Sequence, residues 1–132
     1  MNDRPDARNL LETARGALTA DILPALPEAL RYTGLMIANA MAIAQRELEA
    51  GDARLRDEHE RVSRLLAERP GSERAGTPAA DALHGVLEDY NRRLARAIRF
   101  GRFDGNERAA MLDHLRRTTE EKLGVSNPKL LK

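Results

Sequence analysis

Apolar residues recur every three or four positions along most of the chain, which is the spacing of one face of an α-helix. No segment of the sequence shows the regular alternation of apolar and polar residues expected of a half-buried strand. Prolines and glycines divide the pattern into five predicted helices, at about residues 5–23, 27–50, 52–69, 78–100 and 104–123. We therefore predict an all-α fold, a bundle of four to five antiparallel helices in a single domain that spans residues 1–132.

The run of residues 33–44 is the most apolar stretch of the chain and contains no charged residue. Its apolar residues surround the predicted helix on every side, a pattern typical of buried helices. Gly34, Ala38 and Ala42 recur at four-residue spacing, so one flank is small enough for a neighbouring helix to approach closely. We predict that the helix of about residues 28–50 is the buried centre of the bundle.

The helix after this central one should be peripheral. Gly51 is expected to end the central helix in a left-handed conformation, and Pro70 to stop the helix that follows. Between them, charged residues dominate and the apolar stripe is thin, so we expect this segment on the outside of the bundle. The stripe consists of Leu55, Val62, Leu65 and Leu66.

Capping residues mark where the remaining helices should begin. Asp104 is followed three residues later by Glu107, the spacing of a capping box, and Met111, Leu112, Leu115 and Leu123 are the predicted inward residues of that helix. The other predicted starts are Pro5, capped by Asn2 or Asp3, and Thr77–Pro78.

Composition and charge exclude several classes of function. The chain has 22 basic and 21 acidic residues, so no overall field recruits nucleic acid or an anionic membrane. Two Phe, two Tyr and no Trp leave little aromatic surface for stacking bases, and the absence of Cys removes disulfides and thiolate chemistry. The charged N-terminus lacks the apolar core of a signal peptide, and the central apolar run is too short to span a bilayer. We expect a soluble, cytoplasmic protein with no nucleic-acid or membrane partner.

Asn39 interrupts the apolar run, and a buried primary amide must find hydrogen-bond partners. We predict that Asn39 is buried and bonded to a backbone carbonyl, to Tyr90 or to Asn91. Two interpretations follow. The amide either fixes the register of the helices, or it contacts a ligand in a polar pocket of the bundle.

Asp81, His84 and Glu88 fall on one face of a predicted helix, as half of a metal or acid–base site would. Metal sites in helical bundles need matching ligands on facing helices, which the sequence does not offer, so we predict a solvated face and no metal. His59 and His114 are interpreted as packing residues. No nucleophile has a catalytic context, so we assign no catalytic residue and no cofactor.

Arginines concentrate near the end of the fourth predicted helix. Arg92, Arg96 and Arg99 share one face, and Arg102 follows in the connector. Guanidinium groups suit forked contacts with carboxylates or phosphates, so this stripe could serve an anionic ligand or an acidic partner surface. The alternative is a solvated face paired with glutamates of a neighbouring helix.

Three stretches taken together resemble a small bacterial family of uncharacterised all-helical proteins. They are RPDARNLL at residues 4–11, LPALP at 23–27 leading into ANAMAI at 38–43, and NRRLARAIR with GRFD at 91–104. Members of that family are often encoded beside a phosphotransferase of the aminoglycoside/choline-kinase type and an acyl-CoA dehydrogenase. The resemblance implies a part in acyl-CoA metabolism by association and transfers no catalytic residue.

These observations favour a non-enzymatic accessory or interaction protein, with that phosphotransferase or dehydrogenase as its protein partner. We also expect a homodimer, because the charged third helix offers little apolar surface to cover the central helix. The alternative is a small ligand-binding or enzymatic bundle with a polar pocket near Asn39. Converging polar groups in one cavity would favour the alternative, whereas an exposed apolar or charged face would favour an interaction protein.

Overall fold

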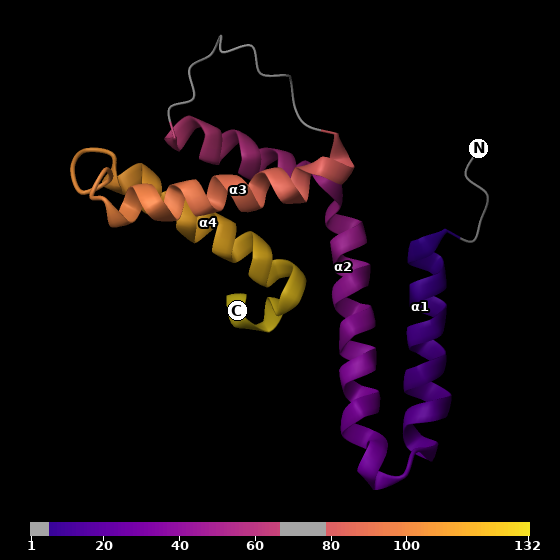
Figure 1. Cartoon of the computed structure of the whole chain (residues 1–132). Helices are drawn as coiled ribbons and strands as arrows, with labels where there is room; N and C mark the ends of the chain where they lie inside the picture. The colour runs from indigo at the N-terminus through magenta and orange to yellow at the C-terminus, as the bar shows by residue number, and fades with distance from the viewer. Residues whose placement is uncertain (1–5, 67–78) are drawn as a thin grey trace. The chain divides into compact units, whose positions relative to one another are not determined.

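The computed structural model describes residues 6–66 and 79–132, and every regular element in these two ranges is helical. Figure 1 shows the four α-helices, and the all-α prediction is confirmed. Short π- and 3-10 turns follow α1 at Leu18–Ile22 and Leu23–Ala25, and another lies at Pro128–Leu131. The α-helices are α1 (Ala7–Ala17), α2 (Glu28–Leu65), α3 (Ala80–Arg99) and α4 (Arg108–Ser126).

The chain forms two compact units that divide at Gly51. Unit 1 contains α1, the turns after it, the first part of α2 and residues 125–130. Unit 2 contains the second part of α2, α3 and most of α4. The single domain expected from the sequence stays a prediction, because compactness of a unit does not show that it folds alone.

Helix α1 begins at Ala7, two residues later than predicted. The carboxylate of Asp6 caps it by accepting a hydrogen bond of 2.9 Å from the backbone N–H of Asn9. The predicted caps, Asn2 and Asp3, lie outside the described residues. After α1 the chain widens into the π turn at Leu18–Ile22 and then tightens into the 3-10 turn at Leu23–Ala25. It becomes extended at Leu26, since proline at position 27 disfavours helical geometry in the residue before it.

Gly51 interrupts the helical geometry of α2, as the sequence predicted. Its φ of 61° and ψ of −168° lie in a region that only glycine adopts readily. The backbone on either side is helical, so α2 consists of two helical segments joined at this residue. The sequence boundary between the two units falls at the same place.

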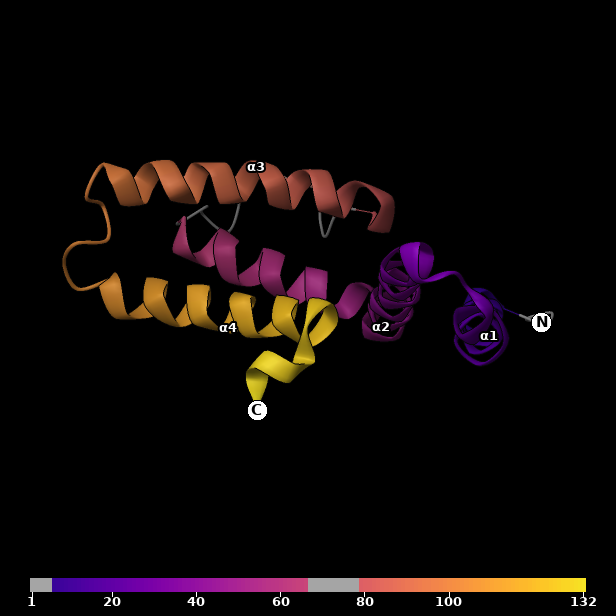
Figure 2. The same ribbon diagram turned by 90° about the horizontal axis from the view of Figure 1, so that it is seen from below.

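In unit 1, α1 and the first part of α2 run side by side in opposite directions (Figures 1 and 2). The small flank of α2 makes close contact with the turn after α1. A Cβ atom on Gly34 would lie only 2.6 Å from Leu23 Cδ2 and 2.8 Å from Leu26 Cδ1. Ala42 on the same flank is buried and Ala38 is partly buried.

The prediction that α2 is a buried central helix is wrong. One neighbouring helix covers one flank of its first part, and the other flanks of a helix that is apolar all round remain exposed. Asn39 is also exposed, so its predicted burial is wrong for the same reason. The exposed large apolar side chains of this segment, 46% to 73% accessible, are Leu30, Tyr32, Leu35, Met36, Ile37 and Leu48.

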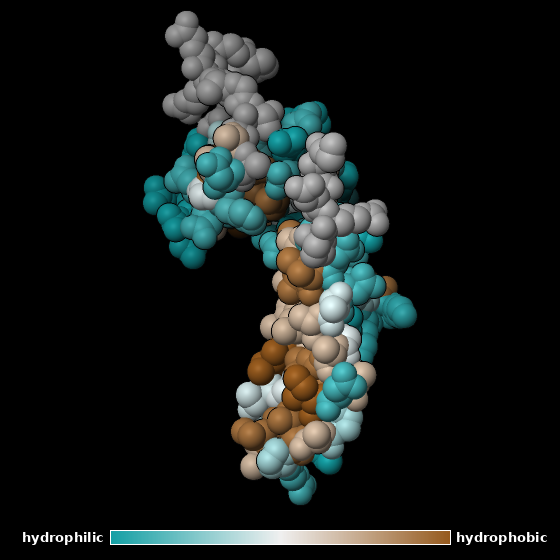
Figure 3. All heavy atoms as spheres, turned by 90° about the vertical axis from the view of Figure 1, so that its right-hand side faces the viewer, coloured by the Kyte–Doolittle hydropathy of each residue, from teal (hydrophilic) through white to brown (hydrophobic). Residues whose placement is uncertain are grey.

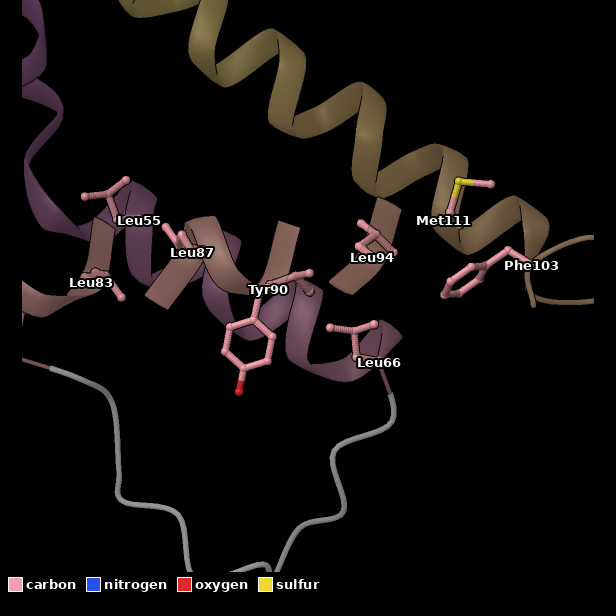
Figure 4. Packing of buried hydrophobic residues seen from close by; sticks show 9 residues of the cluster. Leu55, Leu66, Leu83, Leu87, Tyr90, Leu94, Phe103 and Met111 are labelled. Carbon is pink, nitrogen blue, oxygen red and sulfur yellow. The ribbon is translucent and has the colours of Figure 1, made fainter. Parts of the chain in front are cut away.

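Unit 2 has the main apolar core, which lies between the second part of α2, α3 and α4 (Figure 4). The segment predicted to be peripheral contributes Leu55, Val62 and Leu66 to that core, so its placement on the outside is wrong. A narrow apolar stripe is enough to bury one face of a helix in a small bundle, while its other faces stay charged. The other buried members are Leu83, Leu87, Tyr90, Leu94, Phe103 and Met111.

Helix α4 departs from prediction in both its start and its inward face. It begins at Arg108, and Asp104 lies in the preceding turn, where its backbone N–H donates to the Gly101 carbonyl at 3.2 Å. The predicted capping box therefore does not form. Met111 is buried as predicted and Leu123 is partly buried, but Leu112 is 49% and Leu115 39% exposed. His114 and Thr118 occupy the inward face instead.

The predicted start of the preceding helix at Thr77–Pro78 lies outside the described residues.

Candidate functional site

Five exposed apolar side chains in the first part of α2 form a candidate interaction surface, which we call the apolar hairpin face. It consists of Leu30, Tyr32, Met36, Ile37 and Leu48 of α2. Figure 3 shows hydrophobic residues gathered over the α1–α2 hairpin. Large contiguous apolar patches on soluble proteins mark interaction sites more often than scattered single residues do.

A pocket of about 440 Å³ lies in unit 1, beside a different flank of α2. Three segments line it: the end of α1 with the turns after it, α2 from Leu35 to Arg46, and residues 126–129. Asn39 is exposed and is among the lining residues, so it borders an open pocket and not a packed core. Tyr90 and Asn91, which the sequence grouped with Asn39, belong to unit 2.

Unit 2 contains a cluster of buried polar side chains, and Glu58 is its most buried member at 1% exposure. One carboxylate oxygen, Oε1, accepts a hydrogen bond of 3.4 Å from Asn91 Nδ2 and lies 3.8 Å from Lys122 Nζ. The sequence did not single out Glu58, although it lies three residues after Leu55 and four before Val62, on the same stripe. That spacing was the available signal.

Arg61 joins α2 to α4 within this cluster. Its guanidinium donates two hydrogen bonds to the carboxylate of Glu121, at 3.2 and 2.7 Å, and a third to the Thr118 hydroxyl at 3.3 Å. Both partners of the ion pair are mostly shielded from solvent, with 14% and 22% of the side chains accessible. A forked, largely buried pair of this kind specifies the relative register of the two helices more than it adds net stability.

His114 lies 4% exposed on the inward face of α4. Burial lowers the pKa of its imidazole, and the positive charge of Arg61 lowers it further. The imidazole is therefore held neutral near pH 7, and its Nδ1 has no hydrogen-bond partner among the described residues. His114 and Arg61 also line an open pocket of about 350 Å³ with Glu107 and Asp113.

The structure leaves the predicted polar face of α3 in solvent: Asp81, His84 and Glu88 are all exposed. Within residues 6–66 and 79–132, no group of three His, Cys, Asp or Glu side chains is arranged to hold a metal ion. Tyr90 is buried, with its ring 5.2 Å from the His59 ring in an edge-on arrangement, so both residues take part in packing.

The arginine stripe on α3, defined as Arg92, Arg96 and Arg99, is exposed. Arg92 lies 3.5 Å from Glu88 of the same helix, and both side chains are more than 70% accessible, so this pair is weak. Arg102 is used differently, because its guanidinium lies over the Phe103 ring at 5.5 Å and its Nη2 donates to the Leu65 carbonyl at 3.4 Å.

Several acidic residues of α2 and α4 that could have neutralised the stripe pair with other cations. Glu49 pairs with Arg8, and Glu121 pairs with Arg61 and Arg117. Asp113 and Glu120 both lie near Arg116. The stripe therefore has Glu88 as its one acidic partner in the part of the chain that the structure describes.

A protein-family model described as a domain of unknown function, DUF6285, matches residues 24–130. The chain belongs to this family. The matched range includes all of α2, α3 and α4, and it leaves α1 outside. No curated protein and no solved structure matches the chain. Among the described helices of this DUF6285 chain, none is both long enough and apolar enough to cross a membrane.

Proposed function

We propose that this DUF6285 protein is a non-enzymatic interaction protein that associates through the apolar hairpin face. The observation that supports the proposal is the exposure of large apolar side chains on one helix, from Leu30 at one end to Leu48 at the other. Water in contact with these side chains raises the free energy of the isolated chain, and covering them lowers it.

A second copy of the chain is the occupant we propose for this face. The first part of α2 is apolar all round, yet the turn after α1 covers only the flank of Gly34, and residue 125 contacts α2 at Arg46. Pairing two hairpins around a two-fold axis would surround each α2 with neighbours, as its sequence pattern requires. The same surface patch then serves both copies, so no separate partner surface is needed.

Sedimentation at high micromolar concentration tests this association. The wild-type protein is expected at twice the chain mass of 14.7 kDa. Replacing both Met36 and Ile37 by Glu places charges in the interface and is expected to give the mass of one chain. The matched control is Leu112→Glu, because Leu112 in unit 2 is 49% exposed, as Met36 is. A monomeric wild-type protein, or a double variant that still dimerises, would contradict the proposal.

We also propose that a different protein binds this chain as a partner. The family resemblance set out above suggests a phosphotransferase or an acyl-CoA dehydrogenase, and through them an accessory role in acyl-CoA metabolism. Co-purification from the native organism, with identification by mass spectrometry, tests it. Recovery of neither enzyme class with the tagged wild-type protein would remove this partner assignment and leave the dimer untouched.

The alternative function is a ligand-binding or enzymatic helical bundle with a polar pocket near Asn39. One observation favours it: Asn39 lines the 440 Å³ pocket of unit 1, a volume typical of small-molecule sites. This pocket uses a different flank of α2 from the apolar hairpin face, so both functions can reside on one chain.

A further inference from the structure

The pocket of unit 1 combines positive charge with an apolar wall. Arg15, Arg46 and Lys129 line it, and none of its described lining residues is acidic. These three cations come from α1, α2 and the C-terminal segment, so their charges converge only in the folded unit. Like charges around one hollow repel one another, and a bound anion would offset that repulsion.

Arg46 is the cation best placed to hold such an anion. It is partly buried, and its Nε donates a hydrogen bond of 2.6 Å to the Val125 carbonyl. That bond restrains the guanidinium, while no carboxylate within residues 6–66 and 79–132 pairs with it. A partly desolvated arginine without a carboxylate partner favours an anionic ligand more strongly than a fully exposed one does.

The remaining lining residues limit the kind of anion. Asn39 and Thr19 add polar groups, and Leu23 and Leu35 add an apolar wall. Inorganic phosphate would leave much of a 440 Å³ hollow and its apolar wall in contact with water. Three cations also match the double charge of a phosphate monoester better than the single charge of a carboxylate.

We propose that this pocket binds a small, soluble phosphate monoester, with the phosphoryl group on Arg46, Arg15 and Lys129 and an apolar portion against Leu23 and Leu35. The proposal goes beyond the association through the apolar hairpin face and does not depend on it. Arg46 and Lys129 lie outside that face, so variants at these positions test the pocket alone.

Calorimetric titration of the full chain with hexyl phosphate, inorganic phosphate and hexanoate tests the ligand class. Hexyl phosphate is expected to bind about tenfold or more tightly than either of the other two, because only it engages both the cations and the apolar wall. Its affinity should fall as salt concentration rises, since the pocket is open to solvent. Equal affinities for all three ligands, or no binding of hexyl phosphate at millimolar concentration, would overturn the proposal.

Variants then locate the site. Arg46→Gln and Lys129→Gln are each expected to weaken hexyl phosphate binding, by about tenfold for Arg46, while Arg31→Gln should leave it unchanged. Arg31 is a matched control, because it is an exposed arginine of the same helix that does not line the pocket. Lys129 lies exposed near the chain end, so its variant tests the site even if Arg46→Gln fails to fold. Unchanged binding by the folded variants would overturn the proposal.

A lipid phosphate could offer the same chemistry from a membrane. Vesicles that contain phosphatidic acid provide that arm of the test, with vesicles of neutral lipid as the control. Binding to the phosphatidic acid vesicles without binding to hexyl phosphate would overturn the assignment of a soluble ligand.

Discussion

At the scale of single residues, the buried polar side chains of unit 2 stabilise the fold only if each has a well-placed partner. Glu58 and Arg61 carry charges in a mostly shielded environment, and such groups stabilise a fold only when their partners are held in good geometry. Glu58 accepts a hydrogen bond from Asn91 and forms an ion pair with Lys122. Arg61 donates hydrogen bonds to Glu121 and Thr118. We therefore infer that this cluster selects one register of α2, α3 and α4 over others.

His114 makes the stability of unit 2 depend on pH. Its folded-state pKa lies below the ordinary value of 6.5, so the unfolded chain binds a proton there more readily than the folded chain. The contribution of neutral His114 is fully present above pH 6.5 and is lost as pH falls from 6.5 toward the lower folded-state pKa. Urea unfolding from about pH 8 to about pH 5 should show the free energy of unfolding falling in that window.

His114→Gln is expected to flatten this pH dependence, whatever its effect on stability at neutral pH. His84→Gln is the matched control, because His84 is exposed on α3 and its replacement should leave the slope unchanged. An identical slope in the wild-type protein and in His114→Gln would show that another group carries the pH dependence.

At the scale of elements, Gly51 decides whether α2 is one straight helix or two segments. Its φ of 61° with ψ of −168° is accessible to glycine but strained for any residue with a Cβ. Flanking residues such as Ala50 and Asp52 would otherwise allow the helix to continue. A single glycine therefore separates the two helical segments of α2.

Gly51→Ala is expected to lower the free energy of unfolding by about 1–3 kcal/mol, because alanine is strained in this conformation. Gly85→Ala, within regular α3, is expected to raise it by about 0.5–1 kcal/mol through helix propensity. The two sites are matched, since an added Cβ would meet nothing within 4 Å at either. Urea unfolding of both variants, followed by circular dichroism, makes the comparison. Equal stabilisation would mean that α2 runs straight through residue 51.

At the scale of the whole molecule, the arginine stripe and the apolar hairpin face are two surfaces of the described residues that are open to partners. They lie in different units, and one would bind a partner through apolar contact and the other through charge. Apolar contact is non-directional and little affected by salt, whereas the contribution of exposed arginines falls as ionic strength rises. A partner that uses both surfaces would lose affinity in salt without losing it completely.

Replacing Arg92, Arg96 and Arg99 together by Gln is expected to leave the fold intact, since only the exposed pair with Glu88 is lost. Recovery of an acidic or phosphate-bearing partner in a pull-down from native lysate should fall, and the difference from wild type should shrink between low and moderate salt. Arg116, Arg117 and Arg108 of α4, changed together to Gln, are the control for net charge. Equal recovery by the wild-type protein and the α3 variant at both salt concentrations would show that the stripe is a solvated surface that binds no partner.

The sequence by itself determined the helical class and several of the helix boundaries. Apolar spacing, the prolines at 24 and 27 and the glycine at 51 act through the local backbone, so their effects do not depend on distant residues. The small flank at Gly34 was also visible, because close packing requires small side chains wherever the neighbouring segment comes from.

Only the tertiary structure decided which faces are buried. A helix that is apolar all round is buried only as far as other helices reach it, and one neighbour leaves Asn39 and Met36 exposed. Conversely, Glu58 shares the stripe of Leu55 and Val62, but the Asn91 and Lys122 partners that make a buried carboxylate tolerable come from other helices, and only the packing of the helices buries His114. The pocket cations come from three separate segments, so their convergence is a property of the folded unit alone. Burial and convergence depend on contacts between distant residues, and those contacts exist only once the helices have packed.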